Sequence, residues 1–122
     1  MFVILLAALF FLAMGVYGLL MPAGLIRPFR MSADTPDART EIRAVYGGFG
    51  VAMAAVLALA AADAGHLGRG AVMTVAAALL GMAIGRLAAR AVERPSAFYP
   101  SWLYFWIELV IAAALLAVTR SP

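Results

Sequence analysis

Four long apolar segments occupy most of this chain and leave little room for any other kind of structure. A helix needs about 20 apolar residues to cross the hydrocarbon core of a bilayer. The chain is 66% hydrophobic and 12% charged, whereas soluble domains have roughly 45–50% and 25%. The sequence therefore predicts an all-α polytopic membrane protein, a four-transmembrane-helix bundle. Residues 1–122 are expected to form a single integral membrane domain, with spans at about 1–21, 36–62, 70–91 and 99–118.

The first apolar segment has a second interpretation, as a secretory signal peptide. A signal peptide has a basic region before its apolar run and a small-residue cleavage site after it. No basic residue precedes this run, which is also longer than the apolar core of a signal peptide, and no clean cleavage site follows it. We therefore expect residues 1–21 to be an uncleaved membrane span.

The second span has a well-marked beginning. Thr35 is suited to the N-cap position, Pro36 to the first helical position, and Asp37 to the positively polarised end of a helix. A helix from there to residue 62 is about 40 Å long, which exceeds a hydrocarbon core of about 30 Å. We expect its first turns to lie among the lipid head groups.

The distribution of arginine predicts the orientation of the chain. All nine basic side chains are arginine, and all but Arg69 and Arg120 lie in or beside the first and third connections. Connections rich in arginine stay in the cytoplasm. The sequence therefore predicts a multi-pass membrane protein with both termini outside. Its partner is the lipid bilayer, and no nucleic acid is expected, because these cations flank apolar spans.

Glu108 lies within the last apolar segment. An ionisable side chain at the centre of a span costs at least ~2.5–3.5 kcal/mol, so it needs a partner or a function. Arg43 in the second span and Arg86 in the third are expected in the same cytoplasmic leaflet as Glu108. The sequence predicts that one of these arginines pairs with Glu108, with a bidentate geometry as the natural form.

Tyrosines accompany these charged residues. Tyr46 lies one helical turn after Arg43, and Tyr104 one turn before Glu108. We predict a ligand-binding site formed by Arg43, Tyr46, Arg86, Tyr104 and Glu108, in a pocket between the second, third and fourth spans. Its walls are expected to be apolar, with side chains such as Met82, Phe105 and Ile111. Two other interpretations remain open, a purely structural salt bridge and an interfacial aromatic belt that includes Tyr104.

Small residues recur along three of the spans. Glycine allows two helix backbones to approach closely in a membrane. The glycines in question are Gly15 and Gly18 in the first span, Gly47, Gly48 and Gly50 in the second, and Gly81 and Gly85 in the third. The pattern predicts close helix packing at these positions, including a groove on the third span for another backbone.

The most distinctive local sequence is Arg-Ala-Val-Tyr-Gly-Gly at residues 43–48, preceded by Arg39-Thr-Glu-Ile. With an arginine late in the third span and an acid in the fourth, it resembles a bacterial family of small four-helix membrane proteins. That family is catalogued as a domain of unknown function and is distantly similar to DoxX-like proteins. The resemblance covers nearly the whole chain and implies a four-helix bundle in a bacterial inner membrane. DoxX-like relatives include subunits associated with quinone-linked oxidation, which implies a quinone or another lipidic ligand.

Few residue types in the chain can support catalysis or bind a metal. Cysteine is absent and His66 is the only histidine, so thiolate sites and histidine-built metal or haem sites are excluded within one chain. No phosphate-binding loop, dinucleotide fingerprint or catalytic-triad motif occurs. We expect no cofactor other than a quinone or lipid. We also expect no enzymatic activity, because Glu108 is the only candidate acid or base.

Three functions fit these residues. The leading one is binding of a lipidic or quinone-like ligand at the arginine–glutamate site, in a subunit of a larger membrane complex. The second is a proton-coupled small transporter of lipophilic cations, since small multidrug exporters also carry one membrane-embedded glutamate. Against it, an arginine-paired carboxylate is a poor proton carrier near neutral pH. The third is a structural or assembly factor, with a membrane-protein partner or as a homo-oligomer.

Overall fold

The computed structural model describes residues 1–62, 68–92 and 102–120, and all its regular structure in these ranges is helical. The two long N-terminal elements are α1 (Phe2–Leu20) and the continuous rod made of α3 (Pro36–Ile42), the π-helical turn η2 (Arg43–Gly48) and α4 (Phe49–Ala61). Between them lie α2 (Pro22–Ile26) and the 3₁₀ turn η1 (Arg27–Phe29). The C-terminal half consists of α5 (Gly68–Val92) and α6 (Leu103–Arg120).

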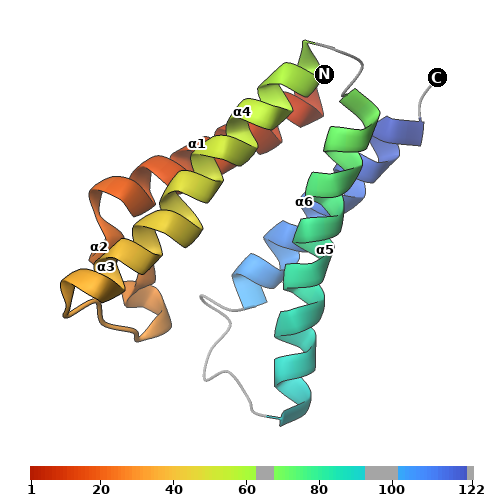
Figure 1. The fold of residues 1–122 in the computed structure, drawn as a ribbon. Coiled ribbons are helices and arrows are strands. Elements are labelled where there is room, and N and C mark those ends of the chain that lie inside the picture. The colour runs from red at the N-terminus through yellow and green to blue at the C-terminus, as the bar shows by residue number, and fades with distance from the viewer. Residues whose placement is uncertain (63–67, 93–101, 121–122) are drawn as a thin grey trace.

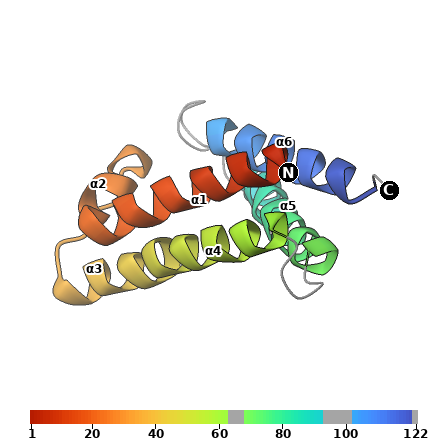
Figure 2. The same cartoon turned by 90° about the horizontal axis from the view of Figure 1, so that it is seen from above.

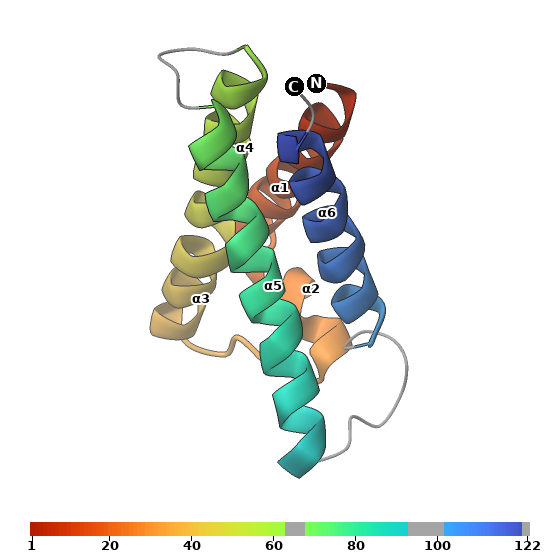
Figure 3. The same ribbon diagram turned by 90° about the vertical axis from the view of Figure 1, so that its right-hand side faces the viewer.

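The long helices form two antiparallel hairpins. One pairs α1 with α4, and the other pairs α5 with α6 (Figure 1). The hairpins meet at the end of the molecule where both chain termini lie, and they diverge toward the end that carries α2 and α3 (Figures 1 and 3). Viewed from above, α1 and α4 run side by side, with α2 beside the far end of α1 (Figure 2). This divergence positions the site described below.

The main core lies where the two hairpins meet. Leu57 of α4, Leu79 of α5 and Leu115 of α6 are almost completely buried there. They pack with the N-terminal half of α1, which contributes Ile4, Ala7, Ala8 and Phe11. A second, smaller cluster of Ile26, Ala33 and Ile42 holds α2 against α3 at the opposite end. The space between the hairpins is therefore closed at one end by core packing.

Glycines bring α1 and α4 into contact, as the sequence predicts. A Cβ atom added to Gly50 would lie 2.8 Å from the Cα of Gly15, and one added to Gly15 would lie 2.6 Å from the backbone nitrogen of Val51. Gly18 and Gly47 face each other one turn farther along, where a Cβ on Gly18 would lie 3.1 Å from the nitrogen of Gly47. No larger residue fits at the Gly15–Gly50 crossing without moving a backbone.

The groove predicted on the third span has no backbone packed in it. A Cβ on Gly81 or Gly85 would meet nothing within 4 Å in the described chain. The reason is the register of α5, whose buried stripe is Val75, Leu79 and Ala83 and therefore lies on the other face of the helix. In this helix the buried face is formed by valine, leucine and alanine side chains and not by glycine.

The long helices occupy the segments in which spans are predicted, and whether they cross a membrane stays a prediction. The second span begins as expected, because the Ala38 backbone N–H donates to the Thr35 hydroxyl at 3.0 Å and Pro36 occupies the first helical position. The predicted start of the fourth span, residues 99–101, lies outside the described residues. The sequence predicts a connection without regular structure at residues 22–35, whereas the structure has α2 and η1 there. They end at Arg30, which has a left-handed backbone conformation (φ 61°).

Three helical stretches are long and apolar enough to cross a membrane: Phe2–Leu20, Pro36–Ala61 and Gly68–Ala89. The apolar part of α6, Leu103–Thr119, is slightly shorter. Large apolar side chains cover the outside of these helices, among them Leu5, Leu9, Leu59, Ile84, Leu87 and Val110. An outer surface of this kind is compatible with a membrane protein and unusual for a soluble monomer.

Candidate functional site

Glu108 lies on the inner face of α6, one turn before the buried Ala112 and two turns before Leu115. Only 2% of its surface is exposed, and within the described residues it is the one charged side chain in the buried class. Arg86 of α5 donates its Nε–H to Glu108 Oε1 at 2.9 Å and an Nη2–H to Oε2 at 3.1 Å. Such a bidentate pair is the arrangement that best compensates a buried carboxylate.

Two aromatic rings lie beside the guanidinium group of Arg86. Its central carbon is 5.9 Å from the ring centroid of Phe29 and 5.7 Å from that of Tyr104. The two rings stack on each other with centroids 5.5 Å apart and planes inclined by 29°. Distances of this size allow cation–π attraction. The cation is therefore held by a carboxylate from α6 and by aromatic rings from both hairpins.

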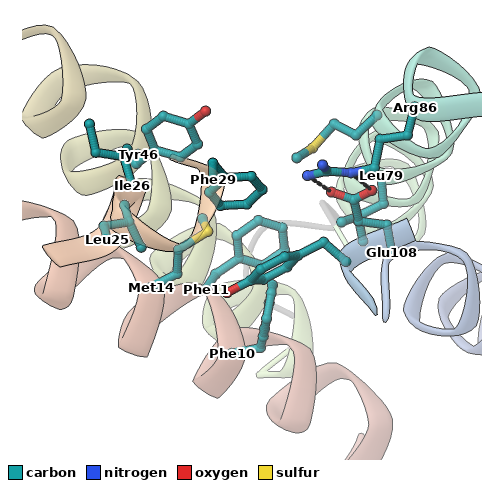
Figure 4. A pocket seen from close by; sticks show the side chains of 12 residues that line it. Phe10, Phe11, Met14, Leu25, Ile26, Phe29, Tyr46, Leu79, Arg86 and Glu108 are labelled. Atoms are coloured by element: carbon teal, nitrogen blue, oxygen red, sulfur yellow. Dashed lines mark hydrogen bonds and ion pairs between the residues drawn. The ribbon is translucent and has the colours of Figure 1, made fainter. Parts of the chain in front are cut away.

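The charged pair forms part of the wall of a pocket between the hairpins. The pocket has about 520 Å³ of empty space, part of it open to the outside. Phe10, Phe11 and Met14 line it from α1, and Leu79 and Met82 line it from α5. Figure 4 shows Arg86 and Glu108 on one side of this space and Tyr46, Ile26 and Leu25 on the other. A mostly apolar lining with a few polar groups is typical of a small-molecule site.

The segment between α1 and α3 closes one side of this pocket. Leu25 and Ile26 of α2 and Phe29 of η1 all line it. Two prolines explain why the chain turns back here, since Pro22 begins α2 and Pro28 lies in η1. No periodic signal in so short a segment indicated that it would face a pocket, and sequence reasoning missed these three residues for that reason.

A shallower groove adjoins the pocket. It is lined by Phe10, Ala13, Met14, Tyr17, Leu25 and Tyr104. Four of these residues, Phe10, Met14, Leu25 and Tyr104, also line the pocket. The two spaces are therefore neighbours, and the groove continues the pocket along the face of α1 that carries Tyr17.

Four of the five predicted site residues come together. Tyr46, Arg86, Tyr104 and Glu108 all line the same pocket. Arg43 is not among its lining residues, and its Nε–H donates to the backbone carbonyl of Leu19 at 3.0 Å. The last carbonyl groups of a helix lack partners within that helix, and Arg43 supplies one at the end of α1. The partner of Glu108 is thus Arg86.

Two of the three expected wall residues lie elsewhere. Met82 lines the pocket, whereas Phe105 packs edge-on against Trp102 and Trp106. Ile111 packs against the main core. The reason is that the pocket lies between α5 and α6 on one side and α1 and α2 on the other. The pocket predicted from the sequence did not include α1 or α2.

The distinctive sequence at residues 43–48 forms a π-helical turn inside the second long rod. Such turns are rare, and they are frequently found at functional sites. Gly47 of this turn packs against Leu19 of α1, while Tyr46 lines the pocket. The sequence predicts a regular helix here, because no side-chain pattern distinguishes one wide turn within a long helix.

Comparison with known families decides how the chain is classified. Residues 1–119 match a domain of unknown function, DUF4345. The chain belongs to this family. No curated protein and no solved structure matches it. The resemblance to a family of unknown function is confirmed, while the relationship to DoxX-like proteins remains a prediction.

The described residues that line the pocket in this DUF4345 chain offer hydrogen bonding and apolar contact. The described residues contain no group of three or more His, Cys, Asp or Glu side chains that could hold a metal ion. The pocket offers the guanidinium of Arg86, the phenols of Tyr46 and Tyr104, and apolar walls. These groups suit recognition of an amphiphile, with a polar head at Arg86 and an apolar remainder.

Proposed function

We propose that this protein is an integral protein of a bacterial inner membrane with four spans, and that it binds a lipidic or quinone-like ligand between its two hairpins. Tyr46, Arg86, Tyr104 and Glu108 form the polar part of the site. The observation that carries this proposal is the Arg86–Glu108 pair, which forms part of the wall of a mainly apolar pocket.

The shape of the site supports an elongated ligand. The pocket provides a place for a polar head beside Arg86, and the adjoining groove along α1 provides an apolar path for a chain. A site within a membrane can select an amphiphile by its head group while the chain remains among apolar side chains. Ala13 and Tyr17 would contact that chain, since they line the groove but not the pocket.

The orientation in the membrane follows from the arginine distribution. Both termini lie at one end of the molecule, and α2, η1 and α3, which carry Arg27 and Arg39, lie at the other (Figure 3). The positive-inside rule favours a cytoplasmic location for the arginine-bearing end. The pocket would then open in the cytoplasmic leaflet, with both termini outside.

A structural role of the ion pair is the second candidate function. Both carboxylate oxygens of Glu108 accept from Arg86, so the pair joins α5 to α6 without any ligand. The same observation disfavours binding of a lipophilic cation at Glu108, because Arg86 already contacts both of its oxygens. The structural role of the ion pair is therefore the alternative that an experiment must separate from ligand binding.

Mass spectrometry of the intact protein tests the proposal. The protein is released from native membranes in mild detergent, and the mass of any bound amphiphile is recorded. Met82→Trp places a large ring in the pocket, because Met82 lines it. Met73→Trp is the matched control, since Met73 is an exposed methionine of the same helix that lines none of the pockets described.

The proposal expects a bound amphiphile on the wild type and on Met73→Trp, and its loss from Met82→Trp. Equal amounts of bound amphiphile on all three proteins would mean that the amphiphile lies on the outer apolar surface. Absence of any specific adduct from all three folded proteins would contradict the proposal and leave the structural role of the pair.

A further inference from the structure

The hydrogen-bonding groups of the Arg86–Glu108 pair restrict the head group that the pocket can accept. We infer that the ligand's head is an uncharged group that accepts hydrogen bonds through a carbonyl-type oxygen, as in an ester or a quinone. This inference rests on the proposed function. It goes further by separating neutral ligands from the anionic lipids and fatty acids that an arginine would otherwise favour.

The pair presents donors to the pocket. A guanidinium group carries five N–H bonds and no acceptor, and two of these five donate to Glu108. The structure shows no hydrogen bond from the remaining N–H groups of Arg86 to any described residue. The Arg86 side chain is 26% exposed, and its tip points into the space between the hairpins (Figure 4). A ligand oxygen can therefore accept from Arg86 without displacing Glu108.

The pair gives the pocket little access to an acceptor in return. Both oxygens of Glu108 accept from Arg86, and the Glu108 side chain is only 3% exposed. A head group that must donate, such as an ammonium, would need to take Glu108 away from its partner. The available chemistry on this wall of the pocket therefore suits an acceptor.

The charge of the site is already balanced. Arg86 and Glu108 carry opposite charges, and the other residues that line the pocket are neutral. Arg43 is hydrogen-bonded to Leu19 and does not line the pocket. A carboxylate or phosphate head would bring a second negative charge next to Glu108 in a poorly solvated space, where an unpaired charge is strongly disfavoured. A neutral carbonyl carries no such penalty.

The experiment compares probes that share a chain length and differ in charge. These are methyl decanoate and a decyl-substituted benzoquinone, both neutral, with decanoate as the anion and decylammonium as the cation. Binding to the wild-type protein in nanodiscs is followed through the side-chain N–H resonance of Arg86, assigned with Arg86→Lys. Partitioning into protein-free nanodiscs is measured for each probe and used to correct its concentration.

The inference expects at least one neutral probe to bind about tenfold more tightly than decanoate, a difference of about 1.4 kcal/mol. Comparison of the ester with the quinone shows which carbonyl source the pocket prefers. Tighter binding of decanoate would overturn the inference and leave the proposed function standing. No response of Arg86 to any probe would contradict both. A response to the cation alone would favour the transporter alternative.

A charge change provides an independent check. Glu108→Gln leaves Arg86 without a counter-charge, so the preference should shift toward decanoate. Glu41→Gln is the matched control, because Glu41 is an exposed residue of α3 that lines none of the pockets described. If Glu108→Gln does not fold, Tyr46→Arg adds a cation to the pocket without touching the pair and should shift the preference in the same direction. An unchanged preference in the folded variant would contradict the charge argument.

Discussion

Arg86 and Glu108 face each other across the α5–α6 hairpin through two hydrogen bonds of 2.9 Å and 3.1 Å. The carboxylate is buried, while the guanidinium reaches from it to the rings of Phe29 and Tyr104. The pair thus connects the C-terminal hairpin to η1, which precedes the second long rod of the N-terminal hairpin. It holds two helices together and places a cation in the pocket between the hairpins.

Breaking this pair should destabilise the protein. Glu108→Gln leaves a partly buried arginine without its counter-charge, and we expect the free energy of unfolding to fall by about 1–3 kcal/mol. Arg86→Gln in the same chain should recover part of that loss, because no unpaired charge then remains. Thermal unfolding in detergent of the two single variants and the double variant measures the coupling. Strictly additive losses would show that the two side chains do not stabilise each other.

The crossing of α1 and α4 should tolerate no side chain larger than hydrogen. Gly50→Ala places a methyl group 2.8 Å from the Cα of Gly15, and we expect a loss of about 1–3 kcal/mol from the resulting overpacking. Gly81→Ala is the matched control on α5, where the added methyl group meets nothing within 4 Å. Its stability should be unchanged or raised by up to about 1 kcal/mol. Equal effects of the two variants would contradict the helix packing described here.

The helical architecture was largely predictable from the sequence, because it depends on properties that are local. Runs of apolar residues and the Thr35–Pro36 start signal predicted the long helices to within a few residues. The convergence of Arg86 and Glu108 was also predictable, since an antiparallel α5–α6 hairpin brings the end of one helix beside the beginning of the next. The sequence alone does not show whether Arg86 or Arg43 pairs with Glu108, because the pairing depends on the direction of the arginine side chains.

Arg43 should act on stability and not on ligand binding. Arg43→Gln removes the hydrogen bond from its Nε to the Leu19 carbonyl, and we expect a loss of about 1 kcal/mol. Arg27→Gln is the control, since Arg27 is an exposed arginine at the same end of the molecule. Unfolding measurements and probe binding on both variants separate the two roles. Weaker binding by Arg43→Gln with unchanged stability would return Arg43 to the ligand site.

The orientation of the chain can be tested because cysteine is absent from the sequence. Single cysteines introduced at Arg30 and at Ser121 should react differently with a thiol reagent that does not cross the membrane. The positive-inside rule predicts labelling from outside at position 121 and protection at position 30. The opposite pattern would place the pocket in the outer leaflet. Labelling of both positions in opened vesicles provides the control for accessibility.

The pocket itself was only partly predictable. Its polar residues were found because ionisable groups are rare in apolar segments, but Phe10, Phe11 and Met14 look like ordinary lipid-facing or core residues in sequence. Phe29 lies in a short turn whose position depends on how the chain folds back after Pro22. Such contacts arise from the tertiary arrangement, and the π-helical turn that contributes Tyr46 likewise has no simple sequence signal.

Photo-crosslinking with a membrane-permeant ester that carries a diazirine in its alkyl chain tests the central claim most directly. Peptide mass spectrometry then locates the modified residues in the protein as it occurs in native membranes. The account predicts that crosslinks concentrate on the pocket and groove, at Phe10, Met14, Leu25 and Met82, and that excess unlabelled methyl decanoate abolishes them. Crosslinks spread evenly over outer residues such as Leu5, Leu59 and Ile84, and insensitive to the competitor, would show that the pocket binds no amphiphile.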